Sequence, residues 1–447
     1  MISPLAYPSI WLTLENWQHE LLLFSAIWFL VGALDDLVID ALWLLHRSGR
    51  WLARYRIAPP MRASELPVPQ EAGLIAIFIP TWREAEVITT MLAGCHNAWA
   101  GSATDYRIYV GCYPNDQAGV AAIMVGCRQF GNARLVLCDS DGPTSKADCL
   151  NRLWRALTRD ELAAGIKAKA IVLHDAEDMV HPDELRVFDY LIERATAVQL
   201  PVIPVRVPGS RWISGHYCDE FAEAHGKALV VREAVGAAIP LAGVGCAISR
   251  THLGRIALAN GGLPFDQSSL TEDYELGLGV AGEGNRTIFA RIQDASGQLV
   301  GTRACFPDHL STAVRQKARW MTGIALAGWD RLGWQGGFIE FWMRLRDRKA
   351  VFAAIVLTAA YACIFLTAVL ILGHLAGHHQ PKPFSDFLLV VLAINAALLI
   401  WRLAVRACFV ARVHGKGEAW IAVPRTLIAN SSALMAARRA VMAALCH

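Results

Sequence analysis

Three long apolar stretches constrain this chain more than any other feature of its sequence. They cover residues 21–45, 351–372 and 384–404, and each has the roughly 20 residues that a helix needs to cross a bilayer core. The composition agrees, because 54% of the 447 residues are hydrophobic and only 18% are charged, whereas soluble domains carry about 25% charged residues. We therefore expect three transmembrane helices beside a domain that lies outside the membrane.

Basic residues indicate which ends of these helices face the cytoplasm. They cluster on one side of each stretch: Arg47, Arg50, Arg54 and Arg56 after the first, Arg344, Arg346, Arg348 and Lys349 before the second, and Arg402, Arg406, Arg412 and Lys416 after the third. Loops rich in lysine and arginine stay in the cytoplasm. We therefore expect the N-terminus and loop 374–383 outside, and residues 51–350 and 406–447 inside. The first stretch lacks a basic start and is too long for a cleaved signal peptide.

The remaining composition excludes several classes of function. The net charge is only +3, and no stripe of lysine and arginine occurs, so a nucleic-acid partner is not expected. The 11 cysteines are scattered without a CxxC pair. Their spacing argues against a zinc ribbon or a disulfide framework and fits a reducing compartment.

Two further segments each leave two interpretations open. Asp35, Asp36 and Asp40 lie within the first apolar stretch, where acidic groups usually face protein or water. They either pair with another helix or line a path for a product. Residues 420–445 are apolar but contain Pro424 and three arginines, which indicates an amphipathic segment in the membrane interface. A fourth span is the alternative.

Between the first and second apolar stretches, the pattern is typical of an α/β domain. Short apolar runs at residues 74–79, 107–111, 134–138 and 170–174 predict buried strands, and residues 84–98 and 147–157 predict helices. This alternation favours a Rossmann-like, mostly parallel sheet with helices on both faces. The expected fold is therefore an α/β domain joined to transmembrane and interfacial α-helices. Ligands of such sheets bind at the carboxyl ends of the strands.

Polar clusters follow the four predicted strands. They occupy residues 80–84, 113–116, 139–148 and 174–178. One such cluster is more often a helix cap or a solvated turn, but four at one sheet edge predict a ligand site. In the last cluster, Asp175 and Glu177 can bind a divalent cation through oxygen, and Lys146 can add positive charge against a diphosphate. The second metal ligand is either Glu177 or Asp178, and the spacing favours Glu177.

Two downstream motifs carry further candidate residues. Asp273 can accept the proton of an acceptor hydroxyl, and one such base suffices for a single displacement that inverts the reacting carbon. Gln316, Arg319 and Trp320 share one face of a predicted helix and suit a sugar ring, although tryptophan and arginine also anchor helices at membrane borders. The glycines within residues 243–246 fit either a close approach to a ligand or a plain tight turn.

In their order along the chain, three motifs resemble those of family 2 glycosyltransferases of the cellulose synthase and hyaluronan synthase kind. They are Asp175-Ala176-Glu177, Thr271-Glu272-Asp273 and the pattern Gln316-x-x-Arg319-Trp320, placed before paired apolar stretches. The resemblance covers roughly residues 20–440. It implies a GT-A catalytic domain, a UDP-sugar donor, and Mg2+ or Mn2+ as the cofactor.

Four segments show a closer likeness. Residues 113–116, 142–151, 174–178 and 215–223 resemble inner-membrane glycosyltransferases of the bacteriophage adsorption protein B type. This resemblance implies a protein of the bacterial inner (plasma) membrane that helps to build a secreted glycan from a UDP-N-acetylhexosamine. Its expected partners are the UDP-sugar, a glycan or lipid-linked acceptor, and membrane lipids.

The resemblance also implies roles for single residues. It places a catalytic base and its acidic neighbour at Asp273 and Glu272, metal ligands at Asp175 and Glu177, donor-binding residues at Thr81, Glu84, Asn115, Asp116, Lys146 and Asp148, and acceptor- or diphosphate-binding residues at Gln316, Arg319 and Trp320. The sequence departs from the commoner pattern at Asn115 and Glu177, where the family has aspartate, so the ligand set stays open.

Three functions compete. The first is processive, inverting sugar transfer to a growing glycan at the cytoplasmic face of the membrane. The second is transfer of one sugar to a lipid-linked acceptor. The third is a membrane scaffold without catalysis, which would not need Asp175 or Asp273. Three spans are few for a private channel, so a dimer or an outer-membrane export partner stays open for the first function.

These expectations divide the chain into five parts. Residues 1–50 form the N-terminal transmembrane helix, 51–305 the GT-A domain, 306–350 the interfacial helices, 351–405 two transmembrane helices, and 406–447 a C-terminal interfacial segment.

Overall fold

The computed structural model describes residues 6–56, 62–71, 73–282, 284–378, 380 and 382–445. The side chains of residues 6–9, 51, 53–56 and 282 are not described, so the part of the orientation argument that uses Arg54 and Arg56 lies outside the described residues. The same holds for residues 379 and 381 of the loop that we expect outside the membrane.

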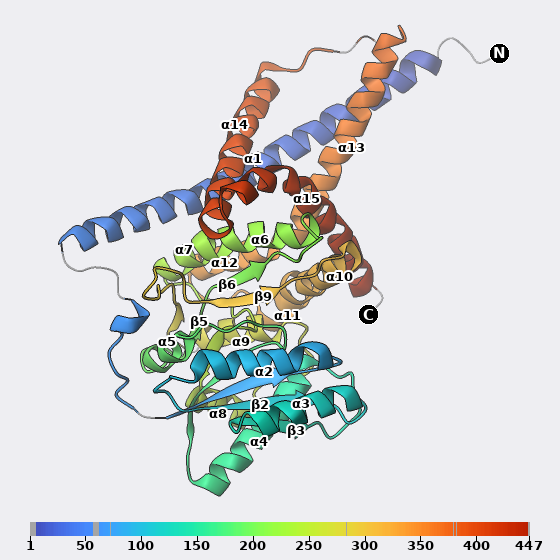
Figure 1. Ribbon diagram of the computed structural model, residues 1–447. Coiled ribbons are helices and arrows are strands. Elements are labelled where there is room, and N and C mark those ends of the chain that lie inside the picture. The colour runs from blue at the N-terminus through green and yellow to red at the C-terminus, as the bar shows by residue number, and fades with distance from the viewer. Residues whose placement is uncertain are drawn as a thin grey trace.

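A seven-stranded sheet forms the centre of the α/β part of the molecule (Figure 1). The strands are β1 (Leu74–Pro80), β2 (Tyr106–Cys112), β3 (Ala133–Leu137), β4 (Ala168–Leu173), β5 (Ala197–Gln199), β7 (Cys246–Ser249) and β8 (Thr287–Phe289), and a separate pair comprises β6 (Val202–Val205) and β9 (Thr302–Cys305). The order across the large sheet is β3-β2-β1-β4-β7-β5-β8. All its neighbours pair in parallel except β7, which is antiparallel to β4 and β5.

The four strands predicted from the sequence are confirmed as β1 to β4, with ends that differ by no more than two residues. They form a continuous parallel block, as the strand–helix alternation indicated. Apolar runs of this kind suit strands whose two faces are both covered by helices. The sheet is mixed rather than wholly parallel because β7 enters between β4 and β5 in the opposite direction.

Helices pack on both faces of this sheet (Figure 1). Those of the α/β part and its border are α2 (Ala85–Trp99), α3 (Gln117–Gln129), α4 (Lys146–Ala164), α5 (Glu184–Leu191), α6 (Ile213–Glu223), α7 (Leu229–Ala234), α8 (Arg250–Ala259), α9 (Glu272–Gly282), α10 (Leu310–Met321), α11 (Gly328–Leu332) and α12 (Phe338–Arg348). A 3-10 turn, η1 (Ala63–Glu65), precedes β1, and two π-helical turns, η2 (Ala224–Ala228) and η3 (Thr322–Ala327), follow α6 and α10.

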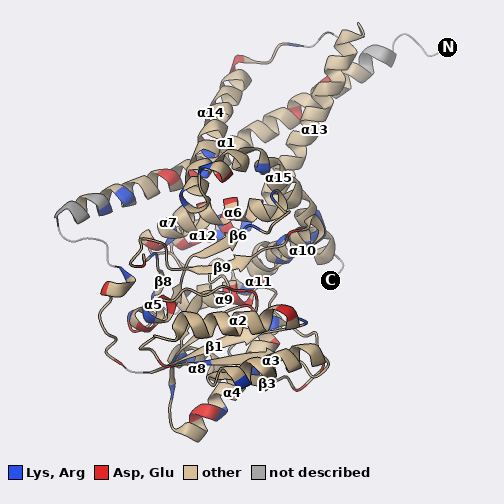
Figure 2. Ribbon diagram, in the orientation of Figure 1, with Lys and Arg blue, Asp and Glu red and all other residues tan. Residues whose placement is uncertain are grey.

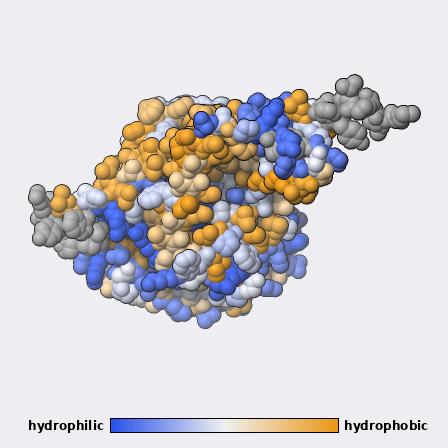
Figure 3. All heavy atoms as spheres, turned by 90° about the horizontal axis from the view of Figure 1, so that it is seen from above, coloured by the Kyte–Doolittle hydropathy of each residue, from blue (hydrophilic) through white to orange (hydrophobic). Residues whose placement is uncertain are grey.

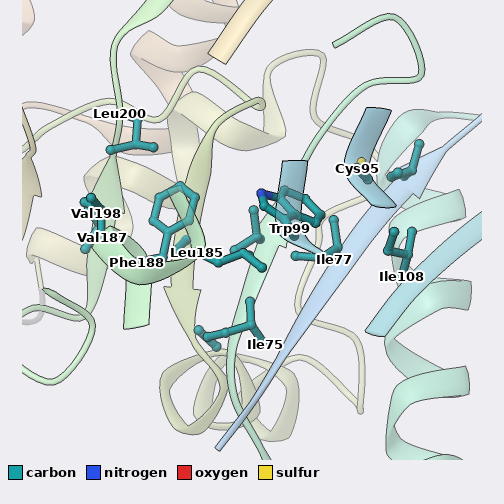
Figure 4. Close-up of a cluster of buried hydrophobic side chains, with 14 of the residues drawn as sticks. Ile75, Ile77, Cys95, Trp99, Ile108, Leu185, Val187, Phe188, Val198 and Leu200 are labelled. Carbon is teal, nitrogen blue, oxygen red and sulfur yellow. The ribbon is translucent and has the colours of Figure 1, made fainter. Parts of the chain in front are cut away.

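The central strand β1 divides the core into two layers. Its side chains alternate between the faces, so Ile75, Ile77 and Ile79 pack with α2, α3 and α5. Figure 4 shows Ile75 and Ile77 in one cluster with labelled side chains of α2 and α5. Ala76 and Phe78 pack on the other face with α4 and α8. All five are fully buried, and burial of one large apolar side chain contributes about 2 kcal/mol. Burial on both faces fixes the register of the sheet, and with it the edge at which the strand ends meet.

Within the described residues, three helices are long and apolar enough to cross a membrane. The candidate spans are Ile10–Arg50 within α1 (Ala6–Arg56), Ala350–Leu375, which is α13, and Asp386–His414, which is α14. The three expected apolar helices are therefore present, but α1 and α14 run well beyond their apolar cores. All three project from one side of the α/β part (Figure 1), and apolar side chains cover much of the surface seen from there (Figure 3).

Three aspartates of α1 pair with basic residues of other helical segments, and Figure 2 shows acidic and basic positions gathered where α1 passes the base of α14. Asp35 binds the guanidinium of Arg346 and, at 2.8 Å, the Nζ atom of Lys349. Asp36 binds Arg346 at 2.8 Å and Arg402 at 3.4 Å. These contacts join α1 to α12, to the start of α13 and to α14. Of the two interpretations of these aspartates, the structure shows pairing with other helices.

Asp40 extends the same network into the α/β part. It binds Lys227 of η2, which also contacts Glu223 of α6 at 2.8 Å. Glu223 in turn pairs with Arg402 at 2.8 Å and with Arg406 at 3.2 Å. We call this group the interhelix charge cluster; its members are Asp35, Asp36, Asp40, Glu223, Lys227, Arg346, Lys349, Arg402 and Arg406.

The last helix, α15 (Lys416–Leu445), is not among the helices apolar enough to span a membrane. It packs against α14, α10 and α6. Its Arg425 is only 1% exposed and binds Asp219 of α6 at 3.1 Å and Glu418 at 2.7 Å. Arg206 binds the same Glu418 at 3.0 Å, but its side chain is 48% exposed.

This pair of arginines gives a matched test of what holds α15 in place. Arg425→Ala leaves two carboxylates without their buried partner, so it should destabilise the fold by about 3–5 kcal/mol. Arg206→Ala removes an exposed partner of one of those carboxylates and should cost about 1 kcal/mol or less. Melting temperatures of both variants in one detergent compare the two costs. Equal shifts in the melting temperatures of the two variants would show that the buried ion pairs of Arg425 stabilise the fold no more than an exposed pair does.

Candidate active site

The parallel block brings the four polar segments to one edge of the sheet. β1, β2, β3 and β4 are neighbours and run in the same direction. Residues 81–84, 113–116, 138–148 and 174–178 follow their carboxyl ends. The edge predicted to bind a ligand therefore exists, and β7 adds the segment that precedes Cys246 to it.

Lys146 connects several segments at this edge. Ser145 caps α4 by accepting a hydrogen bond from the backbone N–H of Asp148 at 3.2 Å, which makes Lys146 the first residue of the helix. Its Nζ donates to Oδ1 of Asp175 at 2.6 Å and to the carbonyl oxygen of Gly243 at 3.3 Å. One ammonium group thus links the start of α4, the end of β4 and the loop before β7.

The charges around Lys146 include the predicted catalytic base. Burial opposes the charge of Lys146, but the carboxylates of Asp175, Glu272 and Asp273 hold its pKa above the usual range. Burial and then the Glu272 carboxylate raise the pKa of Asp273 to about 6, against the pull of Lys146. The backbone N–H of Tyr274 donates to Asp273 Oδ1 at 2.7 Å. Asp273 is therefore half-buried, fixed in place, and ionised near neutral pH.

Gly243 allows Asp273 to approach Lys146. Its φ of +73° favours glycine, and a Cβ atom at this position would overlap Oδ2 of Asp273. The sequence left open whether residues 243–246 serve a ligand or a turn. The structure shows a tight turn, and the carboxylate of Asp273 occupies the space that a side chain at position 243 would fill.

The predicted metal ligands lie beside a third carboxylate. Burial, with Glu177 and Asp175 nearby, raises the pKa of Glu84 to about 8, and burial with Asp175 raises that of Glu177 to about 7. Such repulsion between oxygen ligands is what a hard divalent cation relieves, so the donor set suits Mg2+ or Mn2+. The described residues contain no group of three or more His, Cys, Asp or Glu side chains placed to hold a metal by themselves.

Asp178, the alternative to Glu177, is engaged inside the fold. His174 contacts Asp178 through Nδ1 at 3.0 Å and Glu184 through Nε2 at 2.7 Å. Burial opposes protonation of His174, but these two carboxylates raise its pKa to about 10. The side chain of Glu177 reaches the surface of the molecule, although its carboxylate is crowded by Asp175, so it is the freer carboxylate of this segment.

Several of the predicted donor-binding residues shape the loops of the edge. Asp116 accepts hydrogen bonds from the backbone N–H groups of Arg83 at 2.7 Å and Gly119 at 3.1 Å, and so caps α3. Asp148 accepts from the hydroxyl of Thr144 at 2.9 Å. These two carboxylates hold the turns after β1 and β3, which makes them positioning residues in this structure.

The same edge has an aromatic side that the sequence reasoning did not single out. Thr81 donates to a backbone carbonyl of β2 at 2.8 Å, and the amide of Asn115 exchanges two hydrogen bonds with the backbone of Gly142 at 2.7 and 2.8 Å. The rings of Trp82 and Tyr113 meet edge to face at 5.4 Å. A Cβ atom on Gly142 would overlap both rings, so the loop after β3 packs directly on them.

α10 carries the third predicted group. Trp320 meets Tyr217 of α6 edge to face at 6.3 Å. Burial dominates the pKa of Asp273, and Arg319 is among the groups that lower it, so α10 lies within electrostatic reach of the predicted base. Gly323 of η3 packs on Thr271, since a Cβ there would overlap the threonine side chain. The Thr271-Glu272-Asp273 motif is therefore in direct contact with the π-helical turn that follows the motif on α10.

Three buried polar atoms at these positions have no hydrogen-bond partner among the described residues. They are Oε2 of Glu84, Oγ1 of Thr271 and Oε1 of Gln316. Most buried polar atoms of native proteins are paired, and each unpaired one costs about 1–3 kcal/mol. A polar ligand bound beside these atoms would supply the missing partners.

Comparison with known proteins gives the family context. Residues 70–323 match the family model described as "Glycosyltransferase like family 2". The chain is 35% identical over 444 residues to "Bacteriophage adsorption protein B" of Escherichia coli strain K12 and, equally, to "Bacteriophage N4 adsorption protein B" of Escherichia coli O157:H7. Each alignment covers 94% of this chain but 59% of the relative, so the chain spans about three fifths of their length.

A solved structure shares the fold. It is a mannosyltransferase from Pyrobaculum calidifontis in complex with GDP-Man and Mn2+, which is 17% identical and has a TM-score of 0.52. The match covers 91% of this chain and 99% of that one. The expected GT-A fold with attached apolar helices is thereby confirmed.

The contact between Gly243 and Asp273 can be tested through stability alone. Gly243→Ala combines backbone strain of about 1–2 kcal/mol with a steric clash against the carboxylate. Gly236→Ala is the matched control, because Gly236 has a φ of +76° and open space around it. Gly243→Ala should lower the melting temperature more than the control does. Adding Asp273→Ala should remove the excess, and an unchanged excess in the double variant would refute the contact.

Proposed function

Since this chain belongs to glycosyltransferase family 2, and is therefore a glycosyltransferase, we propose that it transfers a sugar from a nucleoside diphosphate sugar with inversion at the anomeric carbon. The site lies at the strand-end edge, where Lys146, Asp175, Gly243 and Asp273 converge. That convergence carries the proposal, because it places a fixed cation and an ionised base side by side.

Asp273 is the proposed base. An acceptor hydroxyl attacks the anomeric carbon of the donor, and its proton passes to the carboxylate of Asp273, which the backbone N–H of Tyr274 holds in place through Oδ1. The bond between the sugar and the diphosphate breaks, and its electron pair leaves with the nucleoside diphosphate. One displacement occurs on one face of the carbon, so its configuration inverts. A base of this kind contributes about 10²–10⁴-fold to the rate.

Lys146 and the carboxylates act on the leaving group. The ammonium of Lys146 lies where negative charge develops on the diphosphate. Asp175 and Glu177 would hold the divalent cation, with Glu84 beside them, and Mg2+ commonly keeps only one or two carboxylates while phosphates fill its other positions. When bound, the cation neutralises the departing diphosphate. The Mn2+ in the mannosyltransferase of the same fold supports this assignment.

The donor and the setting follow from the family resemblance. We propose UDP-N-acetylhexosamine as the donor, with Glu84, Asn115 and Asp116 on the uridine side next to the aromatic pair Trp82 and Tyr113. Three apolar helices support a multi-pass protein of the inner membrane. The basic clusters beside them support a catalytic domain in the cytoplasm, where nucleotide sugars are made, and the five-part division of the chain given above.

The proposed acceptor is a growing glycan that is extended processively for export. Transfer to a lipid-linked acceptor is the second candidate, and one observation favours it: a cavity of about 710 Å³ with a mostly apolar wall borders α10 next to the site. Whether export uses a dimer or an outer-membrane partner does not affect the chemistry at Asp273.

One experiment tests the proposal directly. The protein in native membranes is incubated with radiolabelled UDP- and GDP-sugars, and the products are sized and partitioned into organic solvent. We expect a UDP-N-acetylhexosamine to label a product, which is a polymer for the first candidate and an extractable lipid for the second. No label from any nucleotide sugar would reject the proposed activity.

Asp273→Asn should keep the fold and lower turnover by about 10²–10⁴-fold. In the unchanged protein, only the ionised carboxylate accepts a proton. Because the pKa of Asp273 is raised to about 6, turnover should fall about tenfold per pH unit below pH 6 and level off above pH 7. The measurement is initial rate against pH at saturating metal. Near-normal turnover of the variant would remove Asp273 from the mechanism.

Chelation should abolish turnover, and Mg2+ or Mn2+ should restore it, because carboxylate oxygens bind both ions. Asp175→Asn should raise the metal concentration needed for half-maximal rate by at least tenfold. Asp139→Asn is the control, since Asp139 is also a strand-end carboxylate and, among the residues that the structure describes, its ion pair is with Arg152. A chelator-resistant rate, or equal effects of the two substitutions, would contradict the metal assignment.

A further inference from the structure

Three ionisable side chains are buried next to the proposed metal ligands. They are His174, Asp178 and Glu184, which are 0%, 3% and 0% exposed. His174 is the first residue after β4, Asp178 lies four residues further along the chain, and Glu184 is the first residue of α5. The proposed mechanism gives none of the three a role, so their burial at this place calls for a separate account.

His174 joins the two carboxylates. Its Nδ1 lies 3.0 Å from Oδ2 of Asp178, and its Nε2 lies 2.7 Å from Oε1 of Glu184. Charged groups are costly to bury unless they are paired and hydrogen-bonded, and here both ring nitrogens meet a carboxylate. Replacement of such a buried network by apolar side chains of similar volume is often neutral or stabilising. The stability of the fold therefore does not by itself account for these three residues.

One end of this network closes the turn that carries the proposed metal ligands. Oδ2 of Asp178 accepts a hydrogen bond from the backbone N–H of Asp175 at 3.0 Å. The backbone N–H of Asp178 donates to the carbonyl oxygen of Asp175 at 3.1 Å. Two hydrogen bonds thus join the ends of segment 175–178, and one of them uses the carboxylate oxygen that His174 contacts. His174 therefore fixes the oxygen that fixes the backbone of Asp175.

The other end of the network is attached to α5. Oε2 of Glu184 accepts a hydrogen bond from the backbone N–H of His181 at 3.1 Å, so both carboxylate oxygens of Glu184 are engaged. Leu185 and Phe188 of the same helix are fully buried in the core (Figure 4). The network thus connects the turn at the strand-end edge to a helix that the core holds in place.

The side chain of Asp175 is held separately from its backbone. Its Oδ1 accepts a hydrogen bond from Nζ of Lys146 at 2.6 Å, whereas the backbone is held by Asp178. Groups that orient metal ligands without touching the metal matter for binding, and their loss typically lowers metal affinity by about 10–100-fold. A buried histidine that anchors the turn of the ligands is in a position to act in this way.

We propose that His174 is a positioning residue for the divalent cation: through Asp178 it holds the backbone of Asp175 where the carboxylates of Asp175 and Glu177 can reach the cation. This inference rests on the proposed function, which assigns those two ligands. In this arrangement Asp178 is not a ligand, because its Oδ2 is engaged twice and its Oδ1, which has no hydrogen-bond partner among the described residues, is buried. The competing interpretation is that Asp178 binds the cation directly.

Binding of Mn2+ alone tests the inference without turnover. The full chain in detergent is titrated with Mn2+, and the electron paramagnetic resonance signal of the free ion gives the concentration for half-saturation. His174→Leu should raise that concentration by about tenfold or more, because both ligands remain but their turn loses its support. His225→Leu is the matched control, since His225 is also buried but accepts from the backbone N–H of Val202 in the separate strand pair. Equal half-saturation concentrations in the two variants would overturn the inference.

Two substitutions of Asp178 separate positioning from direct binding. Asp178→Asn keeps one oxygen for the N–H of Asp175 and for His174, whereas Asp178→Ala removes it. We expect the first variant to bind Mn2+ nearly as the unchanged protein does, and the second to bind it about tenfold more weakly or worse. Equal losses would identify Asp178 as a ligand through its charge, and normal binding by Asp178→Ala would remove it from the site; either result overturns the inference. Melting temperatures show which variants are folded, and this pair decides the question if His174→Leu does not fold.

Failure of the inference and failure of the proposed function give different results. Release of nucleoside diphosphate from a nucleotide sugar by the unchanged protein tests the proposed function. If that release occurs but His174→Leu binds Mn2+ as the control does, the positioning role is wrong and the function stands. If His174→Leu loses Mn2+ binding but the unchanged protein consumes no nucleotide sugar, the positioning role stands and the proposed function fails. An unchanged protein that binds no Mn2+ would overturn the inference together with the metal assignment.

Discussion

The interhelix charge cluster is the interaction on which the rest of the structure depends. Charged groups are costly to remove from water, and a group that loses its partner costs about 3–5 kcal/mol. Each acidic residue of the cluster contacts at least one basic residue on a different helix. The apolar surfaces of α1, α13 and α14 alone would allow sliding, whereas these contacts permit one arrangement.

α6 transmits this arrangement to the active site. Its Glu223 belongs to the charge cluster, its Asp219 binds Arg425 of α15, and its Glu220 binds Lys317 of α10 at 2.6 Å. α10 then leads into η3, which packs on Thr271 near the proposed base Asp273. A single helix thus connects the membrane helices, the interfacial helix and the segment that carries Asp273.

Much of this could be predicted from the sequence because the signals are local. Apolar runs predicted the strands β1 to β4, and short motifs indicated Lys146, Asp175 and Asp273 as candidate site residues. The contacts among these residues were not predictable, since they join segments that are distant along the chain. Gly243 shows no local sign that it accommodates the carboxylate of Asp273, and β7 is too short for its antiparallel direction to be read from four residues. Arg425 is one of the three arginines that indicated an amphipathic interfacial segment, yet it is buried against α6.

The junction between α14 and α15 consists of one residue, Gly415, with a φ of +89°. Because no longer loop separates the two helices, a change in the tilt of α14 would move α15 as well. The far end of α15 lines the cavity beside α10. Apolar helices change tilt when the thickness of the bilayer changes. A change in bilayer thickness that tilts α14 would therefore also move the end of α15 that lines this cavity.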